Sequence, residues 1–299
     1  MWFLLQNVYG FTSILLYIIV TYLTVRERRH FSHSFVVLFV VFAVVNILSY
    51  IGLYLSLRLP IFTKRTSPIA ALFENFPFPS LLRYIIFLCY YLPYCQNMTI
   101  LLIIFNRFRA IAFPFSKEIP YEVLLSIIAI LILPLPLCYD LLFTGAFFKY
   151  KESFQGHYLI SETAHQRERL LYLVVFECAV AFFGLMLNGC GILILLRRSM
   201  SHNRRKEMRL FIVSCICFLF QAVNAIVTLC IYLFAWNSRQ LFVAIFLLPV
   251  CNDLNSLTLP YYFILFNRRI KKCFLDLPLC RRVVNHRSSG EPPTKPTPL

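Results

Sequence analysis

Long apolar stretches alternate with short polar segments along almost the whole chain. Seven stretches are long enough to cross a bilayer: Phe3–Val25, Ser34–Leu57, Tyr84–Phe105, Val123–Phe143, Leu170–Leu196, Leu210–Trp236 and Leu241–Phe266. A helix needs about 20 apolar residues to cross ~30 Å of hydrocarbon. The pattern therefore predicts an all-α membrane protein whose residues 1–266 form a seven-transmembrane helix bundle.

Prolines interrupt two of these stretches. Pro134 and Pro136, together with Asp140, break the second half of the fourth stretch, and Pro260 lies near the end of the seventh. Proline removes a backbone hydrogen bond and clashes with the preceding turn of a helix. We predict a kink in the fourth helix and a hinge at Pro260 and Tyr261.

The composition excludes a water-soluble globule. Apolar side chains make up 60% of the 299 residues, charged ones only 14%, and the mean hydropathy is +0.72. Soluble domains contain about 45–50% apolar and about 25% charged residues. The bilayer is therefore the solvent in which this chain is expected to fold.

Basic residues are distributed unequally between the two ends of the predicted bundle. Segments after the first, third, fifth and seventh stretches hold 20 Lys and Arg, and the other loops hold 9. Basic residues resist translocation, so the N-terminus is predicted outside and the C-terminus in the cytoplasm. The net charge of +16 is then mostly cytoplasmic, where it suits anionic lipid headgroups or an acidic protein partner and not nucleic acid.

The segment after the last stretch has two parts. Ile270, Cys273 and Phe274 recur at i, i+3, i+4, so residues 267–277 are predicted to form a short amphipathic helix on the inner surface. Residues 278–299 are rich in proline and are predicted to be a disordered cytoplasmic tail. Cys273 and Cys280 are equally candidates for palmitoylation and for free structural thiols.

The side chains that intramembrane enzymes and photopigments require are absent from the apolar stretches. All six histidines lie in loops or in the tail, no lysine lies within a stretch, and no glycine-rich phosphate loop or G-x-S-x-G motif occurs. A metal-dependent hydrolase, a retinal Schiff base and a nucleotide-binding site all need such residues. We expect no enzyme activity, no metal and no cofactor.

A layer of polar side chains is predicted near the middle of four helices. Its members are Asn46, Gln96, Asn97, Gln221, Asn224, Asn252, Asp253 and Asn255. Such groups stabilise a bundle by interhelical hydrogen bonds, each worth about 0.6 kcal/mol on average. A layer that can exchange partners is instead a bistable switch, with Asp253 as its charged member. Ion binding at Asp253 is the third interpretation.

A second set of residues points to an outer cavity. Glu177 lies about two turns inside the fifth helix, too deep for free solvation, so it lines a wet cavity, pairs with another helix or marks a misplaced boundary. Tyr90, Tyr91 and Tyr94 crowd the outer half of the third helix, and Tyr54 that of the second. These five residues are the candidate ligand-binding set, although aromatic residues at such depths also serve in packing and interface belts.

Several short motifs resemble those of nematode serpentine chemoreceptors, most closely serpentine receptor class gamma, with class V as a near neighbour. They are Asn46-Ile47-Leu48-Ser49-Tyr50, Leu57-Arg58-Leu59-Pro60, Tyr94-Cys95-Gln96, and Asn106-Arg107-Phe108 through Ile111 to Pro114. The resemblance covers the whole seven-helix region. It implies a G-protein-coupled receptor in the plasma membrane of sensory neurons, by family in the sensory cilium.

The resemblance also implies roles for individual residues. By analogy, Arg107 gates or engages a heterotrimeric G protein, together with Arg109 and the basic third inner loop that contains Arg204, Arg205 and Lys206. Asn106 is neutral, however, so Arg107 lacks the adjacent carboxylate of rhodopsin-like receptors. The second outer loop, Lys149–Arg169, has no cysteine to tether it, so packing alone is expected to hold this lid.

The leading hypothesis is therefore a chemosensory receptor that binds a small molecule and shifts between two states of the bundle. The alternative is a transporter or ligand-gated channel in which the Asn/Asp layer coordinates an ion. Ligand identity, G-protein subtype and oligomeric state do not follow from the sequence.

Overall fold

The computed structural model describes residues 2–113, 120–152, 155–161, 166–197, 202–234 and 238–277. Within them, the side chains of residues 2–5, 120, 166, 202–207 and 238–246 are not described. The predicted tail, residues 278–299, lies outside this range together with Cys280.

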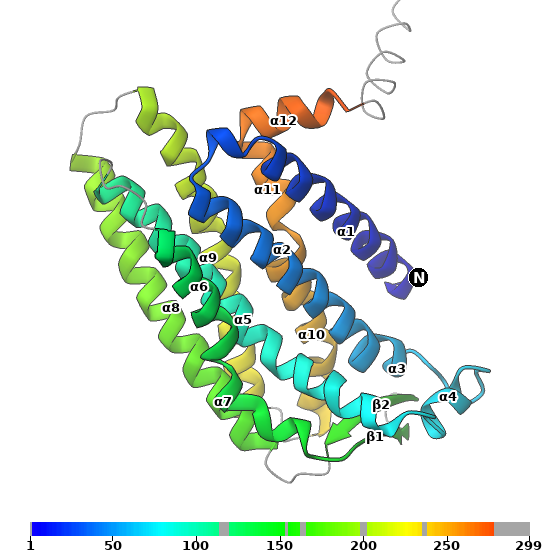
Figure 1. The fold of residues 1–299 in the computed structure, drawn as a ribbon. Coiled ribbons are helices and arrows are strands. Elements are labelled where there is room, and N and C mark those ends of the chain that lie inside the picture. The colour runs from blue at the N-terminus through cyan, green and yellow to red at the C-terminus, as the bar shows by residue number, and fades with distance from the viewer. Residues whose placement is uncertain are drawn as a thin grey trace, which may run out of the picture.

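The described chain is a bundle of long helices (Figure 1). The seven predicted stretches correspond to α1 (Trp2–Arg26), α2 (His33–Leu53) with α3 (Leu59–Ile61), α5 (Pro79–Ala112), α6 (Pro120–Ile132) with α7 (Leu135–Cys138), α8 (Gln166–Arg197), α9 (His202–Phe234), and α10 (Ser238–Leu257) with α11 (Leu259–Phe266). Shorter elements are the 3-10 helices η1 (Arg28–His30) and η3 (Tyr139–Leu142), the π-helix η2 (Tyr54–Arg58), α4 (Ala70–Glu74) and α12 (Arg268–Leu275).

Within the described residues, six helical segments are long and apolar enough to cross a membrane: Gln6–Arg26, His33–Ile61, Pro79–Ala112, Tyr121–Leu142, Arg167–Arg197 and Met208–Phe234. The seventh predicted stretch is divided at Thr258 into α10 and α11, and it is not among these six. Pro260 accounts for the division, because its ring excludes a regular helix through the preceding turn. The fourth stretch is likewise interrupted before Leu135, beside Pro134, as predicted.

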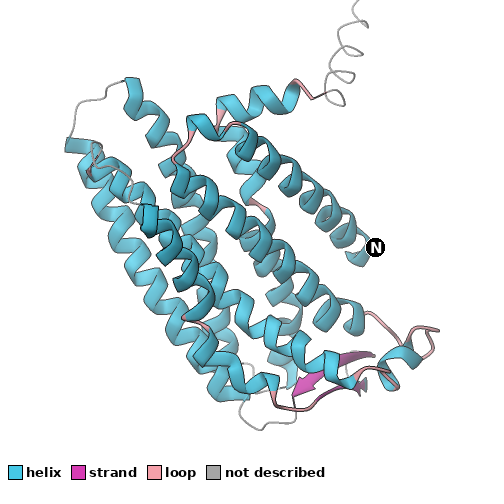
Figure 2. Cartoon of the chain, viewed as in Figure 1, coloured by secondary structure: helices cyan, strands magenta, loops and turns pink. Residues whose placement is uncertain are grey.

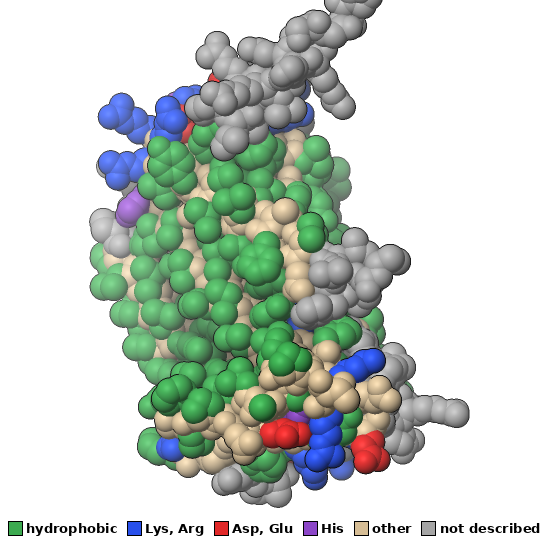
Figure 3. Space-filling model, turned by 90° about the vertical axis from the view of Figure 1, so that its right-hand side faces the viewer, with side chains coloured by type: hydrophobic (Ala, Val, Ile, Leu, Met, Phe, Trp, Pro, Cys, Tyr) green, Lys and Arg blue, Asp and Glu red, His purple; other side chains and the backbone are tan. Residues whose placement is uncertain are grey.

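The surface of the bundle matches a membrane environment. Hydrophobic side chains cover its middle, and charged side chains gather at its two ends (Figure 3). Large apolar residues such as Leu15, Phe183 and Leu193 are more than half exposed on α1 and α8. A soluble monomer does not present so much contiguous apolar surface. The prediction of a helical membrane protein is confirmed.

One end of the bundle carries a two-stranded antiparallel sheet that the sequence pattern does not predict (Figure 2). Strands β1 (Ala146–Lys151) and β2 (Gly156–Ser161) pair from Ala146 opposite Ser161 to Lys151 opposite Gly156. The hairpin packs against the segment between α3 and α5. A ring nitrogen of His157 lies 3.2 Å from the Thr63 carbonyl, and the Phe73 ring lies beside His157. We call this end of the molecule the hairpin end and the opposite one the α12 end.

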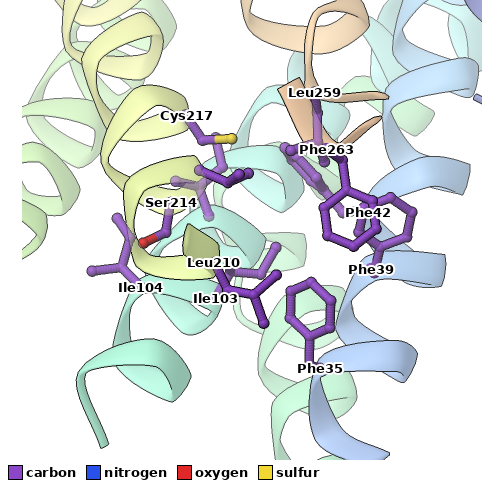
Figure 4. Close-up of a pocket in the computed structure, with 12 residues that line it drawn as sticks. Phe35, Phe39, Phe42, Ile103, Ile104, Leu210, Ser214, Cys217, Leu259 and Phe263 are labelled. Carbon is purple, nitrogen blue, oxygen red and sulfur yellow. The ribbon is translucent and has the colours of Figure 1, made fainter. Parts of the chain in front are cut away.

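The α12 end has a dense aromatic core. Phe35 and Phe39 of α2 lie within 6 Å of the ring of Phe263 on α11, and Leu210 and Cys217 of α9 close the other side (Figure 4). A gap of only about 10 Å³ remains between these side chains. The interior is therefore filled at this end, and the larger cavity lies at the other.

Helix α12 packs across this end, where an amphipathic helix was predicted. Ile270 is fully buried, and Cys273 packs against the aromatic core. Arg269 Nε donates to the Glu27 carboxylate at 2.5 Å. This hydrogen bond is the main cause that lowers the pKa of Glu27 below its ordinary value, so the carboxylate keeps its negative charge to lower pH.

Candidate functional site

A cavity of about 260 Å³ lies between the long helices near the hairpin end. Its walls come from α2, η2, α5, α8, α9 and α10, and β2 contributes Leu159 and Ser161. Most of the lining is apolar, with a small number of polar side chains. This combination is typical of small-molecule binding sites, although the volume is below the ~300–1,000 Å³ common for drug-sized ligands.

Glu177 of α8 is the acidic residue in the cavity wall. Its side chain is 1% exposed, and its Oε1 accepts hydrogen bonds from Asn97 Nδ2 at 3.5 Å and from Asn224 Nδ2 at 3.2 Å. Oε2 has no hydrogen-bond partner among the described residues. Glu177 thus lines a cavity and also bonds to two other helices, which combines two interpretations that the sequence left open.

Asn252 of α10 also lines this cavity. It is 9% exposed, and its Nδ2 has no hydrogen-bond partner within the described chain. Asn255 lies one turn further along α10 and is buried too. Its Oδ1 also has no hydrogen-bond partner within the described chain.

Two hydrogen-bonded chains cross the bundle through neighbouring residues of α5. Gln96 Nε2 donates to Asn46 Oδ1 at 2.7 Å and to Ser256 Oγ at 2.9 Å, and Asn46 Nδ2 in turn donates to the Tyr17 hydroxyl at 2.8 Å. On the other face of α5, Asn97 Oδ1 accepts from Gln221 Nε2 at 2.8 Å. Because Asn97 also donates to Glu177, the second chain joins α9 to α8.

These chains bring together five of the eight residues expected in the polar layer, namely Asn46, Gln96, Asn97, Gln221 and Asn224. Tyr17 and Ser256 were missed, because a hydroxyl within an apolar stretch carries little signal of its own. The network connects α1, α2, α5, α8, α9 and α10, so a change at Glu177 has a bonded route to α5.

Asp253 departs from the sequence-based expectation. Its carboxylate pairs with Arg58, whose Nη2 also donates to the Pro249 carbonyl at 3.1 Å. Arg58 was counted among the outer-loop residues, yet it is 2% exposed. The π-helix η2 follows directly on α2 and extends the helical segment past Leu57, the last residue of the predicted stretch. Its final residue, Arg58, lies inside the bundle. Asp253 therefore already has a cation from the chain, and the outer loops hold 8 basic residues and not 9.

The five candidate ligand residues do not share one environment. Tyr90 and Glu177 line the cavity. Tyr91 lies elsewhere, since its hydroxyl donates to the Leu131 carbonyl at 2.6 Å on α6. Tyr94 is buried against Phe176, and Tyr54 stacks on Tyr50. Counting residues along a helix does not give the direction in which a side chain points.

At the α12 end, Arg107 is buried against the start of α2. Its Nη2 donates to Ser32 Oγ at 3.2 Å, and its guanidinium carbon lies 4.4 Å from the centre of the Phe35 ring. Asn106 bonds to Ser34 in the same turn of α2. A hydroxyl and an aromatic face are thus among the contacts that hold Arg107 beside the start of α2.

The other predicted G-protein residues are partly described. Arg109 forms an ion pair with Glu122 of α6 and remains partly exposed. Arg204, Arg205 and Lys206 belong to the first turns of α9, but their side chains lie outside the described ones.

The predicted hinge lies against α1. Pro260 is buried at the start of α11, and the Tyr261 hydroxyl is 2.9 Å from Ser13 Oγ. The Tyr261 ring also stacks on Tyr9. A movement of α11 would therefore either break the contacts of Tyr261 with α1 or move α1 together with α11.

Comparison with known proteins agrees with the resemblance seen in the sequence. The chain is 24% identical over 287 residues to serpentine receptor class gamma-31 of Caenorhabditis elegans, and this similarity covers 91% of the chain and 90% of that receptor. A family model described as Srg family chemoreceptor matches residues 3–274. The chain therefore belongs to the Srg family of chemoreceptors.

Proposed function

We propose that this chemoreceptor binds a small molecule in the cavity at the hairpin end and activates a heterotrimeric G protein at the α12 end. The observation that carries the proposal is the cavity itself, which is lined by five long helices and β2 and has Glu177 in its wall. A ligand there would act on the receptor only if it bound two states of the bundle with different affinity. The hydrogen bonds from Glu177 through Asn97 to Gln221 offer one contact that can differ between such states.

Arg107 is the proposed switch residue at the opposite end. It holds α5 against the first turn of α2 through Ser32 and Phe35. Release of this contact would free a guanidinium for a partner, and the exposed basic residues of α12 would face the same side. Anionic lipid headgroups are the second proposed partner of α12. We place the receptor in the plasma membrane, in the sensory cilium by its family.

The test is a signalling assay in cells that express the receptor with a promiscuous Gα subunit. A panel of odorants and pheromones is applied, and calcium release is the readout. We expect a ligand-evoked response that Arg107→Ala abolishes at equal surface expression. Arg28→Ala, which removes an exposed charge at the same end, should retain it. A full response from Arg107→Ala would contradict this assignment.

The alternative of a channel or transporter made a different assignment for Asp253. It required this carboxylate for a transported ion, whereas the structure pairs it with Arg58. We therefore favour the receptor. An ion current or solute uptake in cells without any G protein, if it were lost in Asp253→Asn, would support the alternative.

A further inference from the structure

Glu177 differs in its contacts from five other acidic residues of the described chain. Five acidic side chains each pair with an arginine: Asp253 with Arg58, Asp140 with Arg169, Glu122 with Arg109, Glu74 with Arg65 and Glu27 with Arg269. Glu177 is more buried than any of these five, yet its described contacts are the amides of Asn97 and Asn224 and the Thr228 hydroxyl, all of them neutral. No cation lies beside it in the described chain.

An ionised carboxylate in such a buried position destabilises the folded protein unless a cation pairs with it. Moving an ionised carboxylate out of water costs several kcal/mol even after relaxation, and paired geometry is what offsets this cost. Asp253 meets this requirement inside the same bundle through Arg58. At Glu177 the oxygen without a hydrogen bond, Oε2, is itself buried, but its side chain forms part of the cavity wall, so a rotation of the side chain brings it to a cation in the cavity.

A second group beside Glu177 matches the same kind of ligand. Asn224 donates through Nδ2 to Glu177, and its Oδ1 has no hydrogen-bond partner among the described residues. An ammonium group carries three N–H donors and no acceptor. It would satisfy Glu177 Oε2 and Asn224 Oδ1, both of which are acceptors, whereas an anion would be repelled by both.

The rest of the wall restricts the body of the ligand. It is mainly aliphatic, with Leu53, Ile86, Leu88, Leu173, Ile231 and Leu248 around the polar end. The volume of about 260 Å³ favours a molecule smaller than a typical drug.

We infer that the ligand of this cavity is a small protonated organic amine, with its ammonium group on Glu177 and Asn224 and its apolar body among the aliphatic side chains. This inference rests on the proposed function, because it names the ligand class of the same cavity. Tyr90, at the cavity wall, adds an aromatic surface beside the bound amine.

Thermal unfolding of the purified full-length receptor tests the inference without a G protein. The probes are butylamine, phenethylamine and tryptamine, each compared with the alcohol of the same carbon frame, and phenylacetate serves as the anion. We expect at least one amine to raise the melting temperature more than its alcohol does, and phenylacetate to have no effect. If no amine stabilises the wild-type receptor, or if alcohols match the amines, the inference is overturned.

Glu177→Gln identifies the residue responsible. Glutamine keeps the shape and can still accept hydrogen bonds from Asn97 and Asn224, so we expect folding with amine affinity reduced at least about tenfold. Glu74→Gln removes a carboxylate at the same end, outside the cavity wall, and should leave amine binding unchanged. An amine preference that survives Glu177→Gln would refute the assignment. A signalling response to non-amines alone would refute this inference while supporting the proposed function.

Discussion

Arg58 and Asp253 face each other inside the bundle, with side chains only 1% and 7% exposed. Each neutralises the other, so loss of one partner leaves a buried charge. We expect Asp253→Asn to lower the free energy of unfolding by about 3–5 kcal/mol. Replacement of both residues, Arg58→Met with Asp253→Leu, should cost less than Asp253→Asn alone, because no charge then remains.

The measurement is thermal unfolding of the purified variants in one detergent. Glu74→Gln is the control, since its partner Arg65 is exposed and a surface pair contributes about 0–1 kcal/mol. A double variant less stable than Asp253→Asn would show that the pair stabilises the bundle by more than mutual neutralisation.

The same pair shows what residue counting can and cannot predict. Asp253 was correctly placed within a helix, because position along an apolar stretch gives depth. Its partner was not found, because Arg58 follows the last residue of the predicted stretch and a π-turn then rotates it inward. Rotation about the helix axis also separates Tyr90, which lines the cavity, from Tyr91, which bonds to α6. Depth follows from the sequence, whereas pairing depends on rotations that tertiary contacts set.

At the scale of elements, the hairpin is held to α3 by a close backbone approach. A Cβ on Gly156 would lie 2.1 Å from the Ile61 carbonyl oxygen, a contact that no side chain can tolerate. We expect Gly156→Ala to displace the start of β2 and to destabilise the receptor by about 1–3 kcal/mol. Gly189→Ala on α8 is the matched control, since nothing lies within 4 Å of its Cβ position.

Thermal unfolding and amine binding should be measured together for these two variants. Because Leu159 and Ser161 of β2 line the cavity, Gly156→Ala should weaken binding as well, whereas Gly189→Ala should be neutral or stabilising, as alanine is in a helix interior. Equal behaviour of the two variants would mean that the hairpin does not depend on the contact with Ile61.

Long elements were predictable from the sequence, and short ones were not. In lipid, a charge-free run of about 20 residues satisfies its own backbone hydrogen bonds by forming a helix. Each predicted stretch accordingly corresponds to a helix or a pair of helices. The hairpin lies in a loop between two predicted helices, where its six-residue strands, AFFKYK and GHYLIS, give only a weak alternation of apolar and polar residues. The break at Thr258 was expected from Pro260, because proline acts locally.

At the scale of the whole molecule, the two ends of the bundle differ in charge and in packing. The α12 end is filled by aromatic rings, and the hairpin end contains the cavity. With Arg58 assigned to the interior, the predicted cytoplasmic segments hold 20 basic residues and the opposite loops hold 8. The cavity is therefore on the side with fewer basic residues, which is the extracellular side in the predicted orientation.

This asymmetry predicts the topology of the receptor. Basic residues in short loops remain in the cytoplasm, so the N-terminus should be extracellular and the C-terminus, which follows α12, cytoplasmic. Epitope tags fused to the two ends of the receptor can be stained in intact cells and again after permeabilisation, with a cytosolic protein as the control for membrane integrity. We expect the N-terminal tag to stain in intact cells and the C-terminal tag only after permeabilisation. Staining of both tags under the same condition would require an even number of membrane crossings. The positions of the two ends would then no longer place the cavity and Arg107 on opposite sides of the membrane.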